Sequence, residues 1–177
     1  EIEGKGKLGK MGLTELFFET VEPPNDEVPI SDMLKILPEG EYFFRGNAYE
    51  NGQRKGITTG TALLTHNIPK GPVIVYPAEG ALVPMNNLSF SWEPVTKTID
   101  DKPVTIISYQ LIIQKDEPVH KHMIGKKGIM MYLSPTVTKM PIPKEALEPH
   151  TKYNWEVLAI EESGNQALMS SYFITGA

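Results

Sequence analysis

The stretch LEPHTKYNWEVLAI, residues 147–160, decides the fold of the larger part of this chain. Every second position of its second half is apolar or aromatic, at Tyr153, Trp155, Val157 and Ala159. Such alternation is typical of a β-strand that buries one face. Pro149 and Thr151 stand just before the strand, so a stiff turn leads into it. The stretch therefore predicts a strand that begins with a buried Tyr, whose hydroxyl needs a hydrogen-bond partner.

Six further short apolar runs share this part of the chain and are separated by turn residues. They lie at residues 73–76, 88–92, 104–114, 129–133, 136–142 and 170–175. Seven short strands with turn signals between them are typical of a β-sandwich.

From about residue 71 to residue 177 the chain resembles a fibronectin type III domain. In LSFSWEP Trp92 stands where that family keeps its core Trp, and SYQLII supplies Tyr109. Leu147, Pro149, Thr151 and Tyr153 are similar to the corner motif L-x-P-x-T-x-Y of the family. The resemblance implies an immunoglobulin-like, seven-stranded β-sandwich in which Trp92, Tyr109, Leu147 and Tyr153 are structural. In such a corner the Tyr hydroxyl bonds to backbone a few residues upstream.

Residues 1–70 do not match that family and are expected to form a smaller β-rich region. Within it we predict a short helix at 31–37 with Ser31 as N-cap and a β-hairpin at 41–65. The run 13–19 is predicted as a strand, with one helical turn as the alternative. The hairpin prediction rests on Asn51-Gly52, because both central residues of a tight hairpin turn need positive φ.

The segments LTELFFE (13–19) and LPEGEYFFRG (37–46) look similar to the N-terminal part of bacterial exported proteins of unknown function. That resemblance implies a secreted or periplasmic setting and supplies no activity. The sequence opens at Glu1 without a charged and then apolar leader, so we expect a processed or truncated piece.

Composition argues against several classes of protein. The formal net charge is −5 and no Lys/Arg cluster occurs, which disfavours a nucleic-acid binder. There is no Cys, so disulfides, thiolate metal sites and Cys nucleophiles are excluded. No apolar run approaches the roughly 18–20 residues of a membrane-spanning helix.

Acidic side chains give the first candidate site. In a type III sandwich the B–C and F–G loops share one end. Here the B–C loop is KTIDDKP (97–103) and the F–G loop is IEESGNQ (160–166), and together they carry carboxylates and one amide. These candidate binding residues are Asp100, Asp101, Glu161, Glu162 and Asn165. Five such side chains would suit Ca²⁺, which prefers six to eight oxygen ligands, or a basic partner. The alternative interpretation is two solvated loops with ordinary turn residues.

His120 and His122 give a weaker metal candidate. In a strand the spacing His-x-His places both rings on one face, with Asp116 or Glu117 as a third ligand. A polar connection between two strands is the competing interpretation. His66 and His150 are expected at the surface.

No catalytic motif is present, so we predict a protein that is not an enzyme. The expected function is a binding or structural module of an exported protein, which mediates protein contact or spacing. A carbohydrate- or calcium-binding accessory module is the alternative, with Tyr42, Phe43, Phe44 and Tyr49 as an aromatic platform. Self-association through a strand edge, at 170–175 or at 13–19, is a further expectation.

Overall fold

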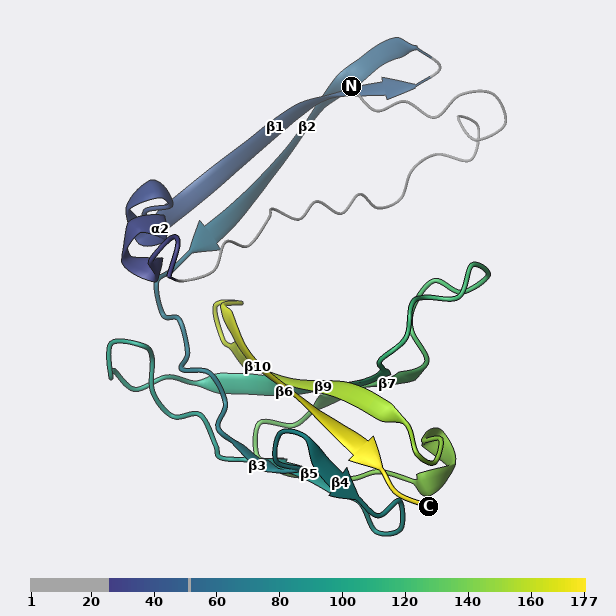
Figure 1. Cartoon of the computed structure of the whole chain (residues 1–177). Helices are drawn as coiled ribbons and strands as arrows, with labels where there is room; N and C mark the ends of the chain where they lie inside the picture. The colour runs from purple at the N-terminus through teal and green to yellow at the C-terminus, as the bar shows by residue number, and fades with distance from the viewer. Residues whose placement is uncertain (1–25, 51) are drawn as a thin grey trace. The chain divides into compact units, whose positions relative to one another are not determined.

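The computed structural model describes residues 26–50 and 52–177 (Figure 1). The chain divides into two compact units, Glu1–His66 and Asn67–Ala177. The first unit contains helix α2 (Ile30–Ile36) and strands β1 (Gly40–Glu50) and β2 (Gln53–Leu64). The strand predicted at 13–19 lies outside the described residues.

Helix α2 begins one residue earlier than the sequence predicted. Its N-cap is Pro29, no side chain caps it, and the Pro29 carbonyl accepts the N–H groups of Asp32 (2.9 Å) and Met33 (3.3 Å). The prediction that Ser31 caps the helix is therefore wrong, because Ser31 already lies inside the first turn. Lys35 and Asp32 form an ion pair on the exposed surface of the helix (2.6 Å).

Strands β1 and β2 form an antiparallel hairpin with one register shift between Ala48 and Tyr49. Gly52 has a φ of +74° at the turn, a conformation that suits Gly. Successive side chains of a strand point to opposite faces, so Phe43 and Phe44 lie on opposite sides of the hairpin, and both are exposed. The four aromatic side chains predicted as one platform are thus divided between two faces.

The second unit is an immunoglobulin-like β-sandwich, as the sequence predicted. One sheet contains β3 (Ile74–Tyr76), β5 (Ser89–Trp92) and β8 (Lys139–Pro141), in the order β3-β5-β8. The other has the order β4-β10-β9-β6-β7 and contains β4 (Ala81–Val83), β6 (Ile106–Lys115), β7 (Gly128–Leu133), β9 (Lys152–Glu161) and β10 (Gln166–Thr175) (Figure 1). The seven predicted runs all form strands, although the run at 136–142 is strand only over its last part.

Strand β4 is the element that the sequence analysis missed. It pairs in parallel with the end of β10, through Phe173–Ala81, Ile174–Leu82 and Thr175–Val83. Only three residues long, β4 is too short for a periodic pattern to identify it. Its pairing also corrects the predicted free edge at 170–175, because β4 covers the last three residues of that strand.

Aromatic side chains from both sheets fill the core. The Phe90 ring packs edge-to-face against Trp155 (centroids 4.9 Å apart, interplanar angle 74°) and against Phe173 (5.3 Å, 68°). Trp92 packs against Tyr109 in a similar edge-to-face arrangement (5.5 Å, 62°). Such pairs add about 0.5–1.5 kcal/mol beyond the burial of their area. The alternating residues Tyr153, Trp155, Val157 and Ala159 form the buried face of β9.

The corner before β9 is held by two buried hydroxyl groups. The Glu148 N–H donates to the Tyr153 hydroxyl (2.8 Å), five residues downstream. The Thr175 hydroxyl donates to the Glu148 carbonyl (2.6 Å) and accepts the Thr151 N–H (2.9 Å). Both backbone groups of Glu148 are therefore bonded to side chains of buried residues, from β9 and β10 respectively.

The sandwich unit begins a few residues before the predicted boundary at 70–71. Pro69 forms a β-bridge with Thr98. The Lys70 N–H donates to the Lys97 carbonyl, and the Ile99 N–H donates to the Ile68 carbonyl, both at 2.9 Å. These backbone bonds attach residues 68–70 to the B–C loop.

Candidate functional site

The B–C and F–G loops do lie side by side, as the acidic-site prediction requires. Ile106 at the start of β6 pairs with Glu161 at the end of β9, and the Glu162 N–H donates to the Thr105 carbonyl (3.2 Å). The two loops thus join at the backbone. Whether they form a site depends on where their side chains point.

The carboxylate of Asp101 is engaged by lysines. Its Oδ1 lies 2.5 Å from Lys70 Nζ and 4.0 Å from Lys97 Nζ. The hydrogen bond from Lys70 lowers the pKa of Asp101, and the positive charges of Lys70 and Lys97 act in the same direction. Asp101 is thus bonded within its own part of the sandwich, while Asp100 is exposed to solvent.

Glu161 closes its own turn. Its side chain is 1% exposed, and Oε2 accepts the Ser163 N–H (3.0 Å) and the Ser163 hydroxyl (2.5 Å). The Glu161 N–H donates to the Asn165 carbonyl (2.9 Å), and the Gly164 N–H donates to the Glu161 carbonyl (2.8 Å). Glu162, by contrast, points into solvent. The F–G loop is therefore a self-bonded turn built around a buried carboxylate.

A metal site is not formed by these residues. Within residues 26–50 and 52–177, no group of three or more His, Asp or Glu side chains is placed to hold a metal ion. The prediction that the five loop side chains converge on Ca²⁺ is therefore not supported, because Asp101 turns to the lysines and Glu161 turns inward.

The His-x-His pair lies in the β6–β7 loop and not in a strand, so the geometric reason for a shared metal is lost. The rings of His120 and His122 are 5.5 Å apart, and His120 Nδ1 faces the His122 N–H at 3.3 Å. Asp116, proposed as a third ligand, bonds instead to Lys152 (2.9 Å) and Asn154 (3.1 Å).

The other proposed third ligand, Glu117, belongs to a surface network of two lysines and two glutamates. Lys115 lies 3.1 Å from Glu117 and 2.6 Å from Glu148, and Lys127 lies 3.8 Å and 3.5 Å from the same carboxylates. The hydrogen bond from Lys115 lowers the pKa of Glu148. The network ties the β6–β7 loop to the corner before β9, which is a structural role.

His66 and His150 also have structural surroundings. His66 Nε2 lies 2.8 Å from the Leu37 carbonyl, and its N–H donates to Glu39 (2.5 Å), which ties the end of the hairpin to the helix C-terminus. His150 sits in the corner loop with a φ of +51°, and its N–H donates to the Gly176 carbonyl (3.2 Å).

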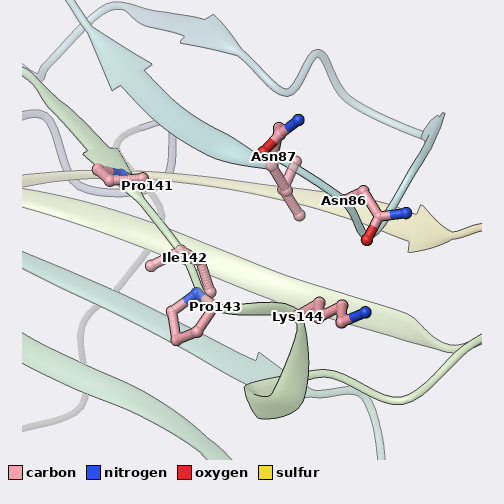
Figure 2. A pocket seen from close by; sticks show the side chains of 7 residues that line it. Asn86, Asn87, Pro141, Ile142, Pro143 and Lys144 are labelled. Atoms are coloured by element: carbon pink, nitrogen blue, oxygen red, sulfur yellow. The ribbon is translucent and has the colours of Figure 1, made fainter.

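A shallow pocket of about 390 Å³ opens at one end of the three-stranded sheet (Figure 2). Asn86 and Asn87 of the β4–β5 turn lie on one side, and Pro141, Ile142, Pro143 and Lys144 lie on the other. Lys144 is the one titratable side chain among its lining residues, and no aromatic ring lines it. The pocket therefore has neither a paired acid and base nor a stacking platform for a sugar.

The outer face of the five-stranded sheet carries the surface that the sequence analysis overlooked. The strand registers place four side chains in one line across β10, β9, β6 and β7. This cross-strand row consists of Leu168, Leu158, Gln110 and Tyr132. Ile112 and Met130 lie beside it, directly opposite each other on β6 and β7.

Most of the row is accessible to solvent. Tyr132 is 68% exposed, Met130 61% and Leu168 48%, while Leu158 and Ile112 are partly exposed. Gln110, the polar member of the row, is only 8% exposed. Accessible apolar side chains gathered on the outside of a sheet are typical of an interaction surface. The signal in the sequence was the run 128–133, which is apolar at every position after Gly128 and so has no polar face.

Membrane-spanning helices are not found: within the described ranges no helix is long and apolar enough to cross a bilayer.

No protein-family model matches the chain, and no curated protein matches it. Among solved structures, the third fibronectin III domain of the human KIAA0343 protein is 14% identical with a TM-score of 0.42, covering 64% of this chain and 88% of that domain. The FN1–FN3 domains of chicken CNTN1 are 15% identical (TM-score 0.41; 79% of this chain, 44% of that one). An engineered protein is 14% identical (TM-score 0.40), and there the match covers 62% of this chain and 21% of the other. Sequence identities and TM-scores this low do not indicate a function. The fold is assigned from the strand order of the two sheets.

Proposed function

We propose that this chain is a non-catalytic module that binds a protein partner on the outer face of its five-stranded sheet. The observation that carries the proposal is the cross-strand row, in which Leu168, Leu158 and Tyr132 lie in one line and remain accessible. Accessible aromatic and aliphatic side chains of this kind supply the anchors of protein interfaces.

The chemistry of the candidate sites supports a role without catalysis. Of the four loop acids, Asp101 is bonded to lysines and Glu161 to its own turn, while Asp100 and Glu162 are exposed; the pocket of Figure 2 has a single titratable side chain. A nucleophile, a base and an orienting group would need to meet in one place for acyl transfer or hydrolysis. The resemblance to exported proteins further supports a setting outside the cytoplasm.

The test immobilises three forms of the full chain and compares which partner proteins each form captures from a lysate of the cells that produce it. Leu158→Ser with Leu168→Ser removes the two leucines of the row, and Val75→Ser changes an exposed apolar residue on the other sheet (56% exposed). We expect one defined partner to be retained by the wild type and Val75→Ser and lost by the double variant. A partner retained equally by all three forms would contradict the proposal.

A further inference from the structure

Strand β7 is the one edge of the sandwich that carries none of the usual protections. It ends the order β4-β10-β9-β6-β7, so no strand of the described residues pairs with its second side. Edge strands normally carry charges or Pro, or are very short, because unpaired backbone N–H and C=O groups invite another strand. Residues 128–133 contain no charged residue and no Pro.

The other edges of the sandwich differ from β7 in these respects. Strands β3, β4 and β8 are three residues long, against six for β7. Pro77 and Pro84 follow β3 and β4 directly, and β8 contains Lys139 and Pro141. The hairpin β1–β2 also exposes its edges; three charged residues are spread along β1, those of β2 (Arg54 and Lys55) lie only at its start, and residues 1–25 of its unit lie outside the described part.

The side chains of β7 divide cleanly between the two faces of the sheet. Ile129, Met131 and Leu133 point toward the core, where they are buried or packed against buried residues. Met130 and Tyr132 point outward and are 61% and 68% exposed. Any strand that pairs with β7 must therefore match this alternation, since a shift of one residue would reverse the faces.

A second copy of β7 in antiparallel orientation satisfies that requirement. With Met131 opposite Met131 on a two-fold axis, Met130 of each copy lies opposite Tyr132 of the other, and Ile129 lies opposite Leu133. Each exposed side chain then covers the other, as an isologous interface demands. Directly opposite residues approach to about 4.5–5.5 Å between Cβ atoms, which is contact distance for Met and Tyr.

Charge does not oppose this pairing. Residues 128–134 contain no charged side chain, and Lys127 lies opposite Pro135 of the second copy. The two sheets would join into one, so the cross-strand rows of the two copies would continue into each other through Tyr132.

We propose that two copies of this chain associate through antiparallel pairing of β7, with Met130 of each copy against Tyr132 of the other. The inference rests on the proposed function only in treating the five-stranded sheet as a protein-binding surface. About six residues a side is well below the roughly 20–30 of a standard interface, so the dimer is weak, with a Kd on the order of 100 μM.

The experiment is sedimentation equilibrium of the full chain from about 10 μM to about 1 mM, a range that brackets the expected Kd. One variant carries Met130→Lys with Tyr132→Lys, and a second carries Met130→Glu with Tyr132→Glu. The proposed register places like charges opposite each other in each variant dimer and opposite charges in the mixed dimer. We expect each variant alone to bind itself at least tenfold more weakly than wild type, and an equimolar mixture to associate again.

Leu168→Lys is the matched control, since it adds a charge to the same face on β10, three strands away from β7. It should self-associate like the wild type, and a thermal melt should show all variants folded. A wild type that stays monomeric at 1 mM would overturn the proposal, as would Lys variants that still associate. Loss in both variants without recovery in the mixture would overturn the register. Because Leu168 is tested apart from β7, a failure here is distinguishable from a failure of partner binding on the row.

Discussion

Replacing Tyr153 by Phe removes one oxygen atom from the corner that precedes β9. The Tyr153 ring is 2% exposed and stacks on Phe173 (centroids 5.5 Å apart, 14°), and Phe preserves that packing. The substitution therefore isolates the 2.8 Å hydrogen bond from the Glu148 N–H. A partly buried N–H left without its acceptor costs about 1–3 kcal/mol. We expect the free energy of unfolding to fall by about that amount.

The measurement is urea unfolding of the full chain, followed by tryptophan fluorescence, since Trp92 and Trp155 are both buried in the sandwich. Tyr132→Phe is the matched control, because it removes the same atom from a side chain that is 68% exposed. It should change stability by less than about 0.5 kcal/mol. If Tyr153→Phe is as stable as Tyr132→Phe, the corner bond does not stabilise the fold and the argument from geometry is refuted.

The second hydroxyl of the corner makes the test sharper. Thr175→Val removes the donor to the Glu148 carbonyl and the acceptor of the Thr151 N–H. Because both changes act on the peptide groups of Glu148, the double variant should lose less than the sum of the single losses, with a coupling of about 0.5–3 kcal/mol. Strict additivity would show that the two hydroxyls hold the corner independently.

Three other outcomes are expected. Glu161→Ala should destabilise the chain by about 1–3 kcal/mol, because the Ser163 N–H and hydroxyl lose their acceptor, whereas Glu161→Gln should cost less; equal losses in urea unfolding would contradict this account. Because the pKa of Glu148 is lowered from its ordinary value of 4.5, its ion pair with Lys115 stabilises the fold at pH values above 4.5, and this contribution is lost as the pH falls through the lowered pKa. Lys115→Met should therefore make the thermal midpoint decline less steeply in acid. An unchanged slope would count against the network. Millimolar Ca²⁺ followed by chelator should leave the thermal midpoint unchanged, because the described acids form no metal site, and a reversible rise would restore the calcium hypothesis.

The sandwich was largely predictable because the local sequence pattern of each longer strand indicates it. Alternation in 152–160, with the Pro and Thr before it, identified both the buried face of β9 and the Tyr whose hydroxyl bonds to backbone. The partner of that hydroxyl was expected a few residues upstream, and Glu148 lies five residues away. What the pattern does not contain is Thr175, because a bond across 27 residues leaves no periodic trace in the chain.

The candidate site was predicted less well, for a physical reason. The resemblance to a type III sandwich implied that Asp101 and Glu161 stand in neighbouring loops, and the backbone bond between Glu162 and Thr105 agrees with that. The orientation of each carboxylate depends on distant lysines and on the turn itself, which composition does not reveal. The cross-strand row was missed because its members come from four strands, and only their registers place Leu168 and Tyr132 in one line.

The pairing of β4 with β10 has a mechanical consequence. The two strands run parallel, and they lie near the beginning and the end of the sandwich unit. Once residues 68–76 have separated from the B–C loop and from β5, tension on the two ends of the unit pulls β4 and β10 in opposite directions along the strand axes, across their hydrogen bonds. The backbone bonds of this seam, including Gly80 N–H to the Tyr172 carbonyl (2.8 Å) and Gly176 N–H to the Val83 carbonyl (2.7 Å), are then loaded together and not one after another. The short strand β4 thus lets the unit resist stretching, because its hydrogen bonds to β10 are loaded in shear.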